Sequence, residues 1–181
     1  MTTHDLMQQR DLGHQVDVAI LEFSKAFDTV PHKRLLGKLE LYGITGNIHR
    51  WITHFLVGRN QSVVVDGARS KEEEVKSGVP QGTVLGPLLF LLHINDIVHA
   101  VDPSTKCRLF ADDCLLYRVI KTTQDQTTLQ RDLDSLENWS SKWGMRFNAS
   151  KCYMMTICRG KKKDHMYELC NTILKGVSQE K

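Results

Sequence analysis

The sequence predicts an α+β fold, in which a small antiparallel sheet carries helices on one face. Residues 16–23 form a compact apolar run rich in β-branched side chains, which is typical of a buried central strand. Residues 108–117 hold two short apolar runs joined by residues that suit a tight turn, which predicts a β-hairpin. Between residues 129 and 143, leucine and tryptophan recur every three or four positions, which indicates one face of a helix.

Shorter patterns fill part of the chain between the first strand and the hairpin. Amphipathic helices are predicted at residues 31–41 and 48–56, because their apolar residues have helical spacing and glycines lie between them. Residues 61–65 predict a strand. The Asp-Gly pair that follows predicts a turn, and residues 72–76 are expected to return antiparallel to the strand.

The composition is that of an ordinary globular chain. Its 181 residues are 41% hydrophobic and 25% charged, which suits one domain with a core, and a net charge of +3 permits a polyanionic partner without requiring one. The five cysteines form no Cys-x-x-Cys pair, so neither a disulfide framework nor a zinc knuckle is indicated. The N-terminal segment lacks a signal-peptide core, and the apolar block at residues 83–97 is too short to span a membrane. We therefore expect an intracellular protein of the cytoplasm or nucleus, not secreted and without a membrane partner, whose oligomeric state is left open.

Asp112 and Asp113 fall at the tip of the predicted hairpin. Two crowded carboxylates repel each other, so a divalent cation between them is stabilising and the tip is a natural metal site. Aspartate is also a common turn former, and an isolated Asp-Asp pair is more often a solvated turn. The pair alone leaves both interpretations open.

Four stretches in order resemble the palm motifs of reverse transcriptases, in particular those of non-long-terminal-repeat (LINE-like, jockey-type) retrotransposons. The similarity covers about residues 14–160. The stretches are residues 23–32 (Phe-Ser-Lys-Ala-Phe-Asp-Thr-Val-Pro-His), 77–87 (Ser-Gly-Val-Pro-Gln-Gly-Thr-Val-Leu-Gly-Pro), 110–113 (Phe-Ala-Asp-Asp) and 147–152 (Phe-Asn-Ala-Ser-Lys-Cys).

The resemblance implies a domain organisation. Residues 16–160 would form a reverse-transcriptase palm with part of the fingers. Residues 1–15 would be a lead-in or truncated fingers, and residues 161–181 a basic tail or the start of a truncated next element. The fingers and thumb are expected to be largely missing.

The resemblance also implies the site and its ligands. The chain would be an RNA-directed DNA polymerase that uses two Mg²⁺ ions, or Mn²⁺, to add deoxynucleoside triphosphates to a DNA primer on an RNA template. The implied catalytic residues are Glu22, Asp112, Asp113 and Lys151; the implied metal-binding residues are Glu22, Phe23, Asp112 and Asp113; and the implied nucleotide- and template-binding residues are Phe27, Pro80, Gln81 and Gly82. We expect the three carboxylates to converge at one end of the sheet, with Gln81 facing the same cleft.

Several of these residues also have a purely structural interpretation. Lys151 matches the family lysine that protonates the leaving pyrophosphate, and a lone lysine in a loop is otherwise a solvated side chain. Phe27 matches the aromatic residue below the incoming sugar, and it also suits the core. Asp28, six residues after Glu22, is interpreted as a carboxylate of a turn or a helix N-terminus.

One position departs from the family pattern. The family has an aspartate where this chain has Glu22, and the extra methylene moves the ligand oxygen by more than the ~0.5 Å tolerance of a productive site. We therefore expect little or no polymerase activity from this chain by itself. A non-catalytic remnant that at most binds nucleic acid, and an unrelated metal-dependent hydrolase built on the Asp-Asp tip, are the alternative functions.

Overall fold

The computed structural model describes residues 2–160 and 162–177, and the chain divides into two compact units. The first unit comprises Met1–Ser24 and Asp96–Lys181, and the second comprises Lys25–Asn95. Each unit is described by itself.

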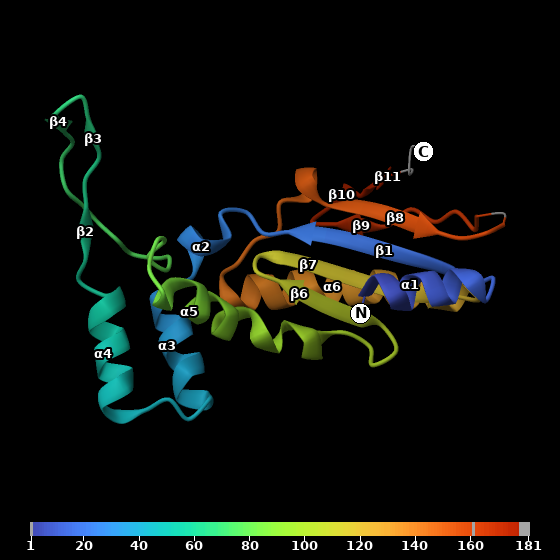
Figure 1. The fold of residues 1–181 in the computed structure, drawn as a ribbon, viewed down its shortest axis with the longest axis horizontal. Helices are drawn as coiled ribbons and strands as arrows, with labels where there is room; N and C mark the ends of the chain where they lie inside the picture. Colours follow the sequence, from blue (N-terminus) through green and yellow to red (C-terminus); the bar gives the residue numbers. More distant parts are fainter. Residues whose placement is uncertain (1, 161, 178–181) are drawn as a thin grey trace. The chain divides into compact units, whose positions relative to one another are not determined.

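The first unit is built on a five-stranded sheet with strand order β11-β8-β1-β7-β6 (Figure 1). The predicted buried strand is β1, and it lies at the centre of the sheet, antiparallel to both of its neighbours. The edge strand β11 runs parallel to β8, so the sheet is mixed and not wholly antiparallel. The strands are β1 (Gln15–Glu22), β6 (Lys106–Phe110), β7 (Asp113–Ile120), β8 (Tyr153–Ile157) and β11 (Lys175–Val177).

Helix α6 (Thr123–Trp143) is the predicted long helix, and its apolar stripe is buried in the core from Leu129 to Trp139, while Trp143 at its end is half-buried. A capping box between Thr122 and Asp125 begins the helix, and Gly144 ends it with a φ of 74°. The helix packs on the face of the sheet to which Arg118 of β7 points, since the Arg118 side chain donates to Asp125. The predicted helix and its glycine stop are therefore confirmed.

A second helix covers part of the other face. Leu6 of α1 (Thr2–Asp11) packs with Val16 and Val18 of β1 and with Tyr117 of β7. The α+β class is confirmed. Helices were expected on one face of the sheet, but α6 packs on one face and α1 on part of the other. The N-terminal segment carries no apolar periodicity, and Leu6 is the buried hydrophobic residue of α1, so no local pattern indicated a packed helix there.

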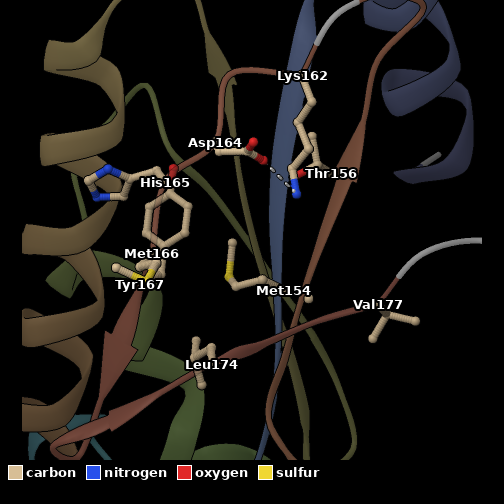
Figure 2. A pocket seen from close by; sticks show the side chains of 10 residues that line it. Met154, Thr156, Lys162, Asp164, His165, Met166, Tyr167, Leu174 and Val177 are labelled. Atoms are coloured by element: carbon tan, nitrogen blue, oxygen red, sulfur yellow. Dashed lines mark ion pairs between the residues drawn. The ribbon is translucent and has the colours of Figure 1, made fainter.

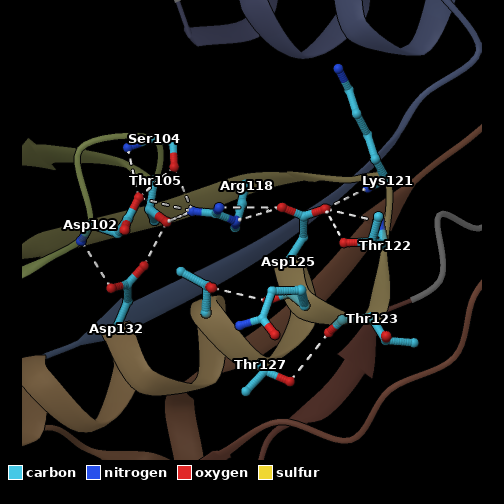
Figure 3. A network of polar contacts seen from close by, with 12 residues as sticks. Asp102, Ser104, Thr105, Arg118, Lys121, Thr122, Thr123, Asp125, Thr127 and Asp132 are labelled. Atoms are coloured by element: carbon cyan, nitrogen blue, oxygen red, sulfur yellow. Dashed lines mark hydrogen bonds and ion pairs between the residues drawn. The ribbon is translucent and has the colours of Figure 1, made fainter.

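A polar network joins β7 to α6 and to the turn before β6 (Figure 3). Arg118 donates to Thr105 at 2.9 Å and to Asp125 at 3.2 and 3.3 Å, and it pairs with Asp102 at 3.3 Å. Asp132 of α6 accepts from the Thr105 hydroxyl and from the Asp102 backbone N–H. Because the guanidinium and the buried carboxylate both have partners, the network stabilises this end of the sheet.

The second unit is mainly helical. Helices α3 and α5 pack together around Leu35, Leu39 and Phe90, and the buried Lys38 ammonium donates to the carbonyl oxygen of His93. The 3-10 helix η1 (Asn95–Ala100) begins at the last residue of this unit, and its other residues belong to the first unit. The helices are α2 (Ala26–Thr29), α3 (His32–Leu41), α4 (Gly46–Leu56) and α5 (Leu85–Ile94). None of the helices described in either unit is long and apolar enough to cross a membrane.

A long hairpin follows α4 in the second unit (Figure 1). Its strands are short, because the predicted strand 61–65 is interrupted: β2 (Asn60–Gln61) pairs with β5 (Glu73–Glu74), and β3 (Val64–Val65) pairs with β4 (Ala68–Arg69). The predicted Asp-Gly turn is present, with positive φ values of 49° and 81° at its two residues.

Candidate active site

Glu22 and Asp113 lie opposite each other at one end of the sheet. They form the last aligned pair between β1 and β7. Cross-strand partners point to the same face, so both side chains lie on the face that carries Val16 and Val18. The side chain of Glu22 is 33% exposed and Asp113 is exposed, so both carboxylates are open to solvent.

The hairpin before β7 places the two aspartates differently from the prediction. The two residues of the turn are Ala111 and Asp112, while Asp113 already belongs to the strand and pairs with Phe110. The hairpin is confirmed, but the placement of both aspartates at its tip is wrong for Asp113. Ala111 takes the left-handed position with a φ of 52°, a conformation that an alanine seldom adopts and that the sequence did not indicate.

Lys151 reaches this end of the sheet from the 3-10 helix η2 (Ala149–Lys151). Its Nζ atom lies 2.6 Å from Oε1 of Glu22, as an ion pair. The hydrogen bond and the charge of Glu22 raise the pKa of the Lys151 ammonium, and the nearby charge of Asp112 raises it further. The structure therefore gathers Glu22, Lys151 and the Asp112–Asp113 pair within the first unit.

Main-chain contacts hold η2 against the end of β1. The backbone N–H of Asn148 donates to the Glu22 carbonyl oxygen at 2.8 Å, and that of Ser24 donates to the Arg146 carbonyl oxygen at 2.7 Å. The Phe23 ring stacks on the Phe147 ring with centroids 4.4 Å apart. Phe23 was predicted to bind metal, but its ring is 2% exposed and supplies no oxygen ligand. Only the main chain of Phe23 could therefore contact a metal ion.

The Pro-Gln-Gly loop (residues 77–82) lies in the second unit, and hydrogen bonds from its first residues hold it against residues 27–30. The backbone N–H of Gly78 donates to the Val30 carbonyl oxygen at 2.8 Å, and that of Val79 donates to the Phe27 carbonyl oxygen at 2.7 Å. A Cβ added to Gly78 would lie 2.8 Å from the Asp28 carbonyl oxygen, and its φ is +91°. Glycine is required here for both reasons.

Asp28 contacts Gln81 and Ser77, and the sequence did not reveal these contacts. Its Oδ1 accepts a 2.9 Å hydrogen bond from Nε2 of Gln81, and its carbonyl oxygen accepts another from the Ser77 hydroxyl. Asp28 lies in the first turn of α2, so its interpretation as a carboxylate of a turn or a helix N-terminus is confirmed, and the contact with Gln81 is additional. A contact between residues 53 positions apart leaves no local pattern to detect.

The remaining predicted nucleotide-binding residues also lie in the second unit. Phe27 stacks on the buried Phe90 with centroids 4.5 Å apart and is itself half-buried, so it is part of the core and still partly accessible. Pro80 and Gln81 line a cavity of about 710 Å³ that Lys25 also lines, and Gly82 beside it is exposed. The carboxylates belong to the first unit, so the expectation that Gln81 faces them stays a prediction.

Comparison with known proteins identifies the family. The model of the family described as "Reverse transcriptase (RNA-dependent DNA polymerase)" matches residues 2–175. The chain belongs to the reverse transcriptase family. The prediction from the four motifs is confirmed.

Curated relatives of this reverse transcriptase chain come from mobile elements. The RNA-directed DNA polymerase from mobile element jockey of Drosophila funebris is 32% identical over 144 residues, which cover 76% of this chain and 16% of the relative. The probable RNA-directed DNA polymerase from transposon BS of Drosophila melanogaster is 28% identical and covers 82% of this chain and 17% of the relative. The chain thus spans about a sixth of the length of these two relatives.

Solved structures show the same fold at low sequence identity. An apo telomerase from Candida tropicalis matches with a TM-score of 0.64 and 12% identity, over 96% of this chain and 38% of that protein. Telomerase from the same organism in complex with a fragment of telomeric RNA matches with a TM-score of 0.62.

The carboxylates of this reverse transcriptase chain suit Mg²⁺ by their chemistry but do not form a ready-made metal site. Carboxylate oxygens are the ligands that Mg²⁺ and Mn²⁺ prefer. Over residues 2–160 and 162–177, no three His, Cys, Asp or Glu side chains are grouped so that they could hold a metal ion. The Lys151 ammonium instead lies on the Glu22 carboxylate, so a metal ion at Glu22 competes with a cation that the chain itself supplies.

A cavity of about 850 Å³ lies apart from these carboxylates (Figure 2). Met154 and Thr156 line it, and they pair in register with Ala19 and Asp17 of β1. Alternation along β1 places this pair of residues on the face opposite Glu22. The cavity is therefore not part of the carboxylate group.

Proposed function

We propose that this chain is the core of a retrotransposon RNA-directed DNA polymerase that extends a DNA primer on an RNA template. The observation that carries the proposal is the aligned pair Glu22–Asp113, with Asp112 and Lys151 beside it at an open end of the sheet. In the reaction the primer 3′-oxygen bonds to the α-phosphorus of a deoxynucleoside triphosphate, and the bond to pyrophosphate breaks.

Each charged group has a role in this proposal. Glu22, Asp112 and Asp113 would hold two Mg²⁺ ions, with Mn²⁺ as a substitute, and the bound ions would activate the 3′-hydroxyl and neutralise the triphosphate. Lys151 would give its proton to the leaving pyrophosphate, since its ammonium already lies at the site. Before it can do so, its ion pair with Glu22 has to open.

Gln81, Pro80 and Gly82 would face the template and the incoming nucleotide. The hydrogen bond from Gln81 to Asp28 fixes the amide in one orientation, which lowers the conformational cost of contacting a base pair. Phe27 would contact the sugar of the nucleotide with its accessible side, while its other side rests on Phe90.

The proposed ligands are an RNA template, a DNA primer and deoxynucleoside triphosphates, and the proposed place of action is inside the cell. All five cysteines are free, which suits a reducing compartment. Membership of the reverse transcriptase family removes the basis for an unrelated hydrolase.

A non-catalytic remnant remains the second candidate, because Glu22 replaces the family aspartate and is engaged by Lys151. A primer-extension assay on a primed RNA template distinguishes the two. We expect little or no extension by the 181-residue chain alone, and extension when this palm is grafted into a complete related polymerase. A grafted enzyme that stays inactive even with Glu22→Asp would reject the polymerase assignment.

A further inference from the structure

Helix α4 exposes a ladder of aromatic rings and a cation. Trp51 is 59% exposed, and its ring stacks on that of Phe55 one turn later, with centroids 6.1 Å apart and planes 23° apart. The guanidinium carbon of Arg59 lies 5.9 Å from the centroid of the Phe55 ring. The buried Ile52 and Leu56 lie about 100° around the helix from Trp51 and Phe55. Phe55 is half-buried, so Trp51 is the ring of the ladder that is exposed to solvent.

The segment around this ladder is basic. Residues 41–65 contain Arg50, Arg59 and two histidines but no aspartate or glutamate. One of the histidines, His49, is half-buried and contacts the Leu36 carbonyl oxygen and the exposed Glu40. Arg59 is exposed, and its carbonyl oxygen accepts a hydrogen bond from the Val75 N–H at 2.8 Å. Among the described residues its guanidinium forms no ion pair, so it is available to a phosphate.

The ladder continues into the cavity beside the Pro-Gln-Gly loop. Arg59 is shared by the two, since it lies against Phe55 and also lines the 710 Å³ cavity with Lys25, Lys76 and Gln81. Asp28 and Glu74 line the same cavity, so its three cations, Lys25, Arg59 and Lys76, exceed its carboxylates by one. All of these residues belong to the second unit, so the track lies within one compact body.

We propose that this aromatic ladder, Trp51–Phe55–Arg59, is a binding track for single-stranded RNA that leads to the Pro-Gln-Gly loop. Unpaired bases stack on the exposed tryptophan ring, and Arg59 contacts a phosphate of the same strand. Aromatic side chains combined with an excess of cations are the chemistry that binds single strands, because every base offers a flat face and every nucleotide a negative charge. The choice of RNA over DNA rests on the proposed function.

A protein partner is the competing occupant of an exposed apolar helix face. The charge favours the nucleic acid, since a segment of 25 residues with no carboxylate lies around the ladder. The two occupants differ in one respect that can be measured. Stacking requires unpaired bases, whereas a protein-binding face would have no preference between RNAs of equal charge.

The test measures fluorescence anisotropy of a labelled short oligouridylate with the full 181-residue chain, without primer, nucleotide or Mg²⁺. We expect Trp51→Ala to weaken binding by on the order of tenfold, and Trp51→Phe, which keeps a ring, to restore most of it. Leu41→Ala is the matched control, because Leu41 is 81% exposed in the same unit but has no ring. An abasic oligomer of equal length and charge should bind wild type and Trp51→Ala alike.

Arg59 is tested through salt. Arg59→Ala should lower the slope of log affinity against log salt by roughly 0.7, the value for one phosphate contact on a single strand. Arg131→Ala, which removes an exposed arginine 3.4 Å from Asp102 in the first unit, should leave the slope unchanged. Equal affinities for Trp51→Ala and Leu41→Ala, or equal binding of the abasic and normal oligomers by wild type, would overturn the proposal.

The binding result and the polymerase result are independent. Trp51-dependent RNA binding, with no primer extension by the grafted enzyme even with Glu22→Asp, would uphold the track and reject the proposed function. Primer extension by the grafted enzyme, with no effect of Trp51→Ala on RNA binding, would support the proposed function and reject the track.

Discussion

Glu22→Asp is the substitution that best separates the two roles of the Glu22 carboxylate. In the wild type, Oε1 lies 2.6 Å from the Lys151 ammonium. Removing one methylene withdraws the carboxylate by about 1.5 Å, one carbon–carbon bond, so the separation becomes about 4 Å. A hydrogen bond does not form at that distance. We therefore expect the ion pair to lose its direct contact while the negative charge stays at the end of β1.

Two measurements follow the change. The pKa of the Lys151 ammonium, which Glu22 raises, should fall towards the ordinary lysine value in Glu22→Asp, as an NMR titration of labelled lysine side chains would show. Magnesium or manganese should bind more tightly, because the carboxylate no longer has to leave Lys151. In the grafted polymerase, a repair worth ~1.4 kcal/mol of transition-state stabilisation gives tenfold faster primer extension.

The control is Asp112→Ala, which should abolish extension both in the wild-type background and in the Glu22→Asp background. Glu22→Gln adds a second control, since it keeps the length of the side chain and removes its charge. Equal extension rates for wild type and Glu22→Asp would show that the longer carboxylate is harmless and that the reasoning about the methylene is wrong.

The remaining predictions concern stability. Gly78→Ala should lower the free energy of unfolding in urea by about 2 kcal/mol, because the new Cβ lies 2.8 Å from the Asp28 carbonyl oxygen and φ is +91°. Gly82→Ala is the control and should lower it less, because φ is +74° but no atom lies within 4 Å of the new Cβ. Equal losses of stability in the two variants would refute the role of the close approach. Hydrogen bonds from Ser104, with Arg118 nearby, lower the pKa of Asp102 to about 2, so its contribution to stability is present above about pH 4 and is lost as the pH falls towards 2. Asp102→Asn should therefore flatten the acid side of a plot of urea midpoint against pH, and an unchanged acid side would contradict the assignment.

Local patterns in the sequence predicted the elements that local chemistry determines. The buried strand β1 and the helix α6 follow from apolar spacing, and Gly144 ends the helix because it adopts a left-handed φ without strain. The hairpin followed from its two apolar runs, but the strand position of Asp113 did not, because it depends on Ala111 taking a positive φ. The parallel edge strand β11 was missed because three residues carry too little pattern to reveal a register.

The motifs name the residues of the candidate site but do not reveal the contacts between them. Family motifs named Glu22 and Lys151, but their ion pair joins positions 129 residues apart. It forms because Phe23 stacks on Phe147 and because the Asn148 N–H bonds the Glu22 carbonyl oxygen. The hydrogen bond between Asp28 and Gln81 has the same character, since tertiary packing alone brings the two side chains together.

Glu22 and Lys151 therefore have to be considered together. Glu22 reaches the lysine that would serve the leaving pyrophosphate in the proposed reaction, so the departure from the family pattern would affect two proposed roles at once. The ion pair would keep the carboxylate from a metal ion and the ammonium from the pyrophosphate. Both effects disappear when the methylene is removed, whereas Lys151→Met frees only the carboxylate. Lys151→Met could tighten Mg²⁺ binding as much as Glu22→Asp does and yet leave primer extension slow. That result would show that the lysine both blocks metal binding and takes part in the reaction, because only Glu22→Asp would keep the second role.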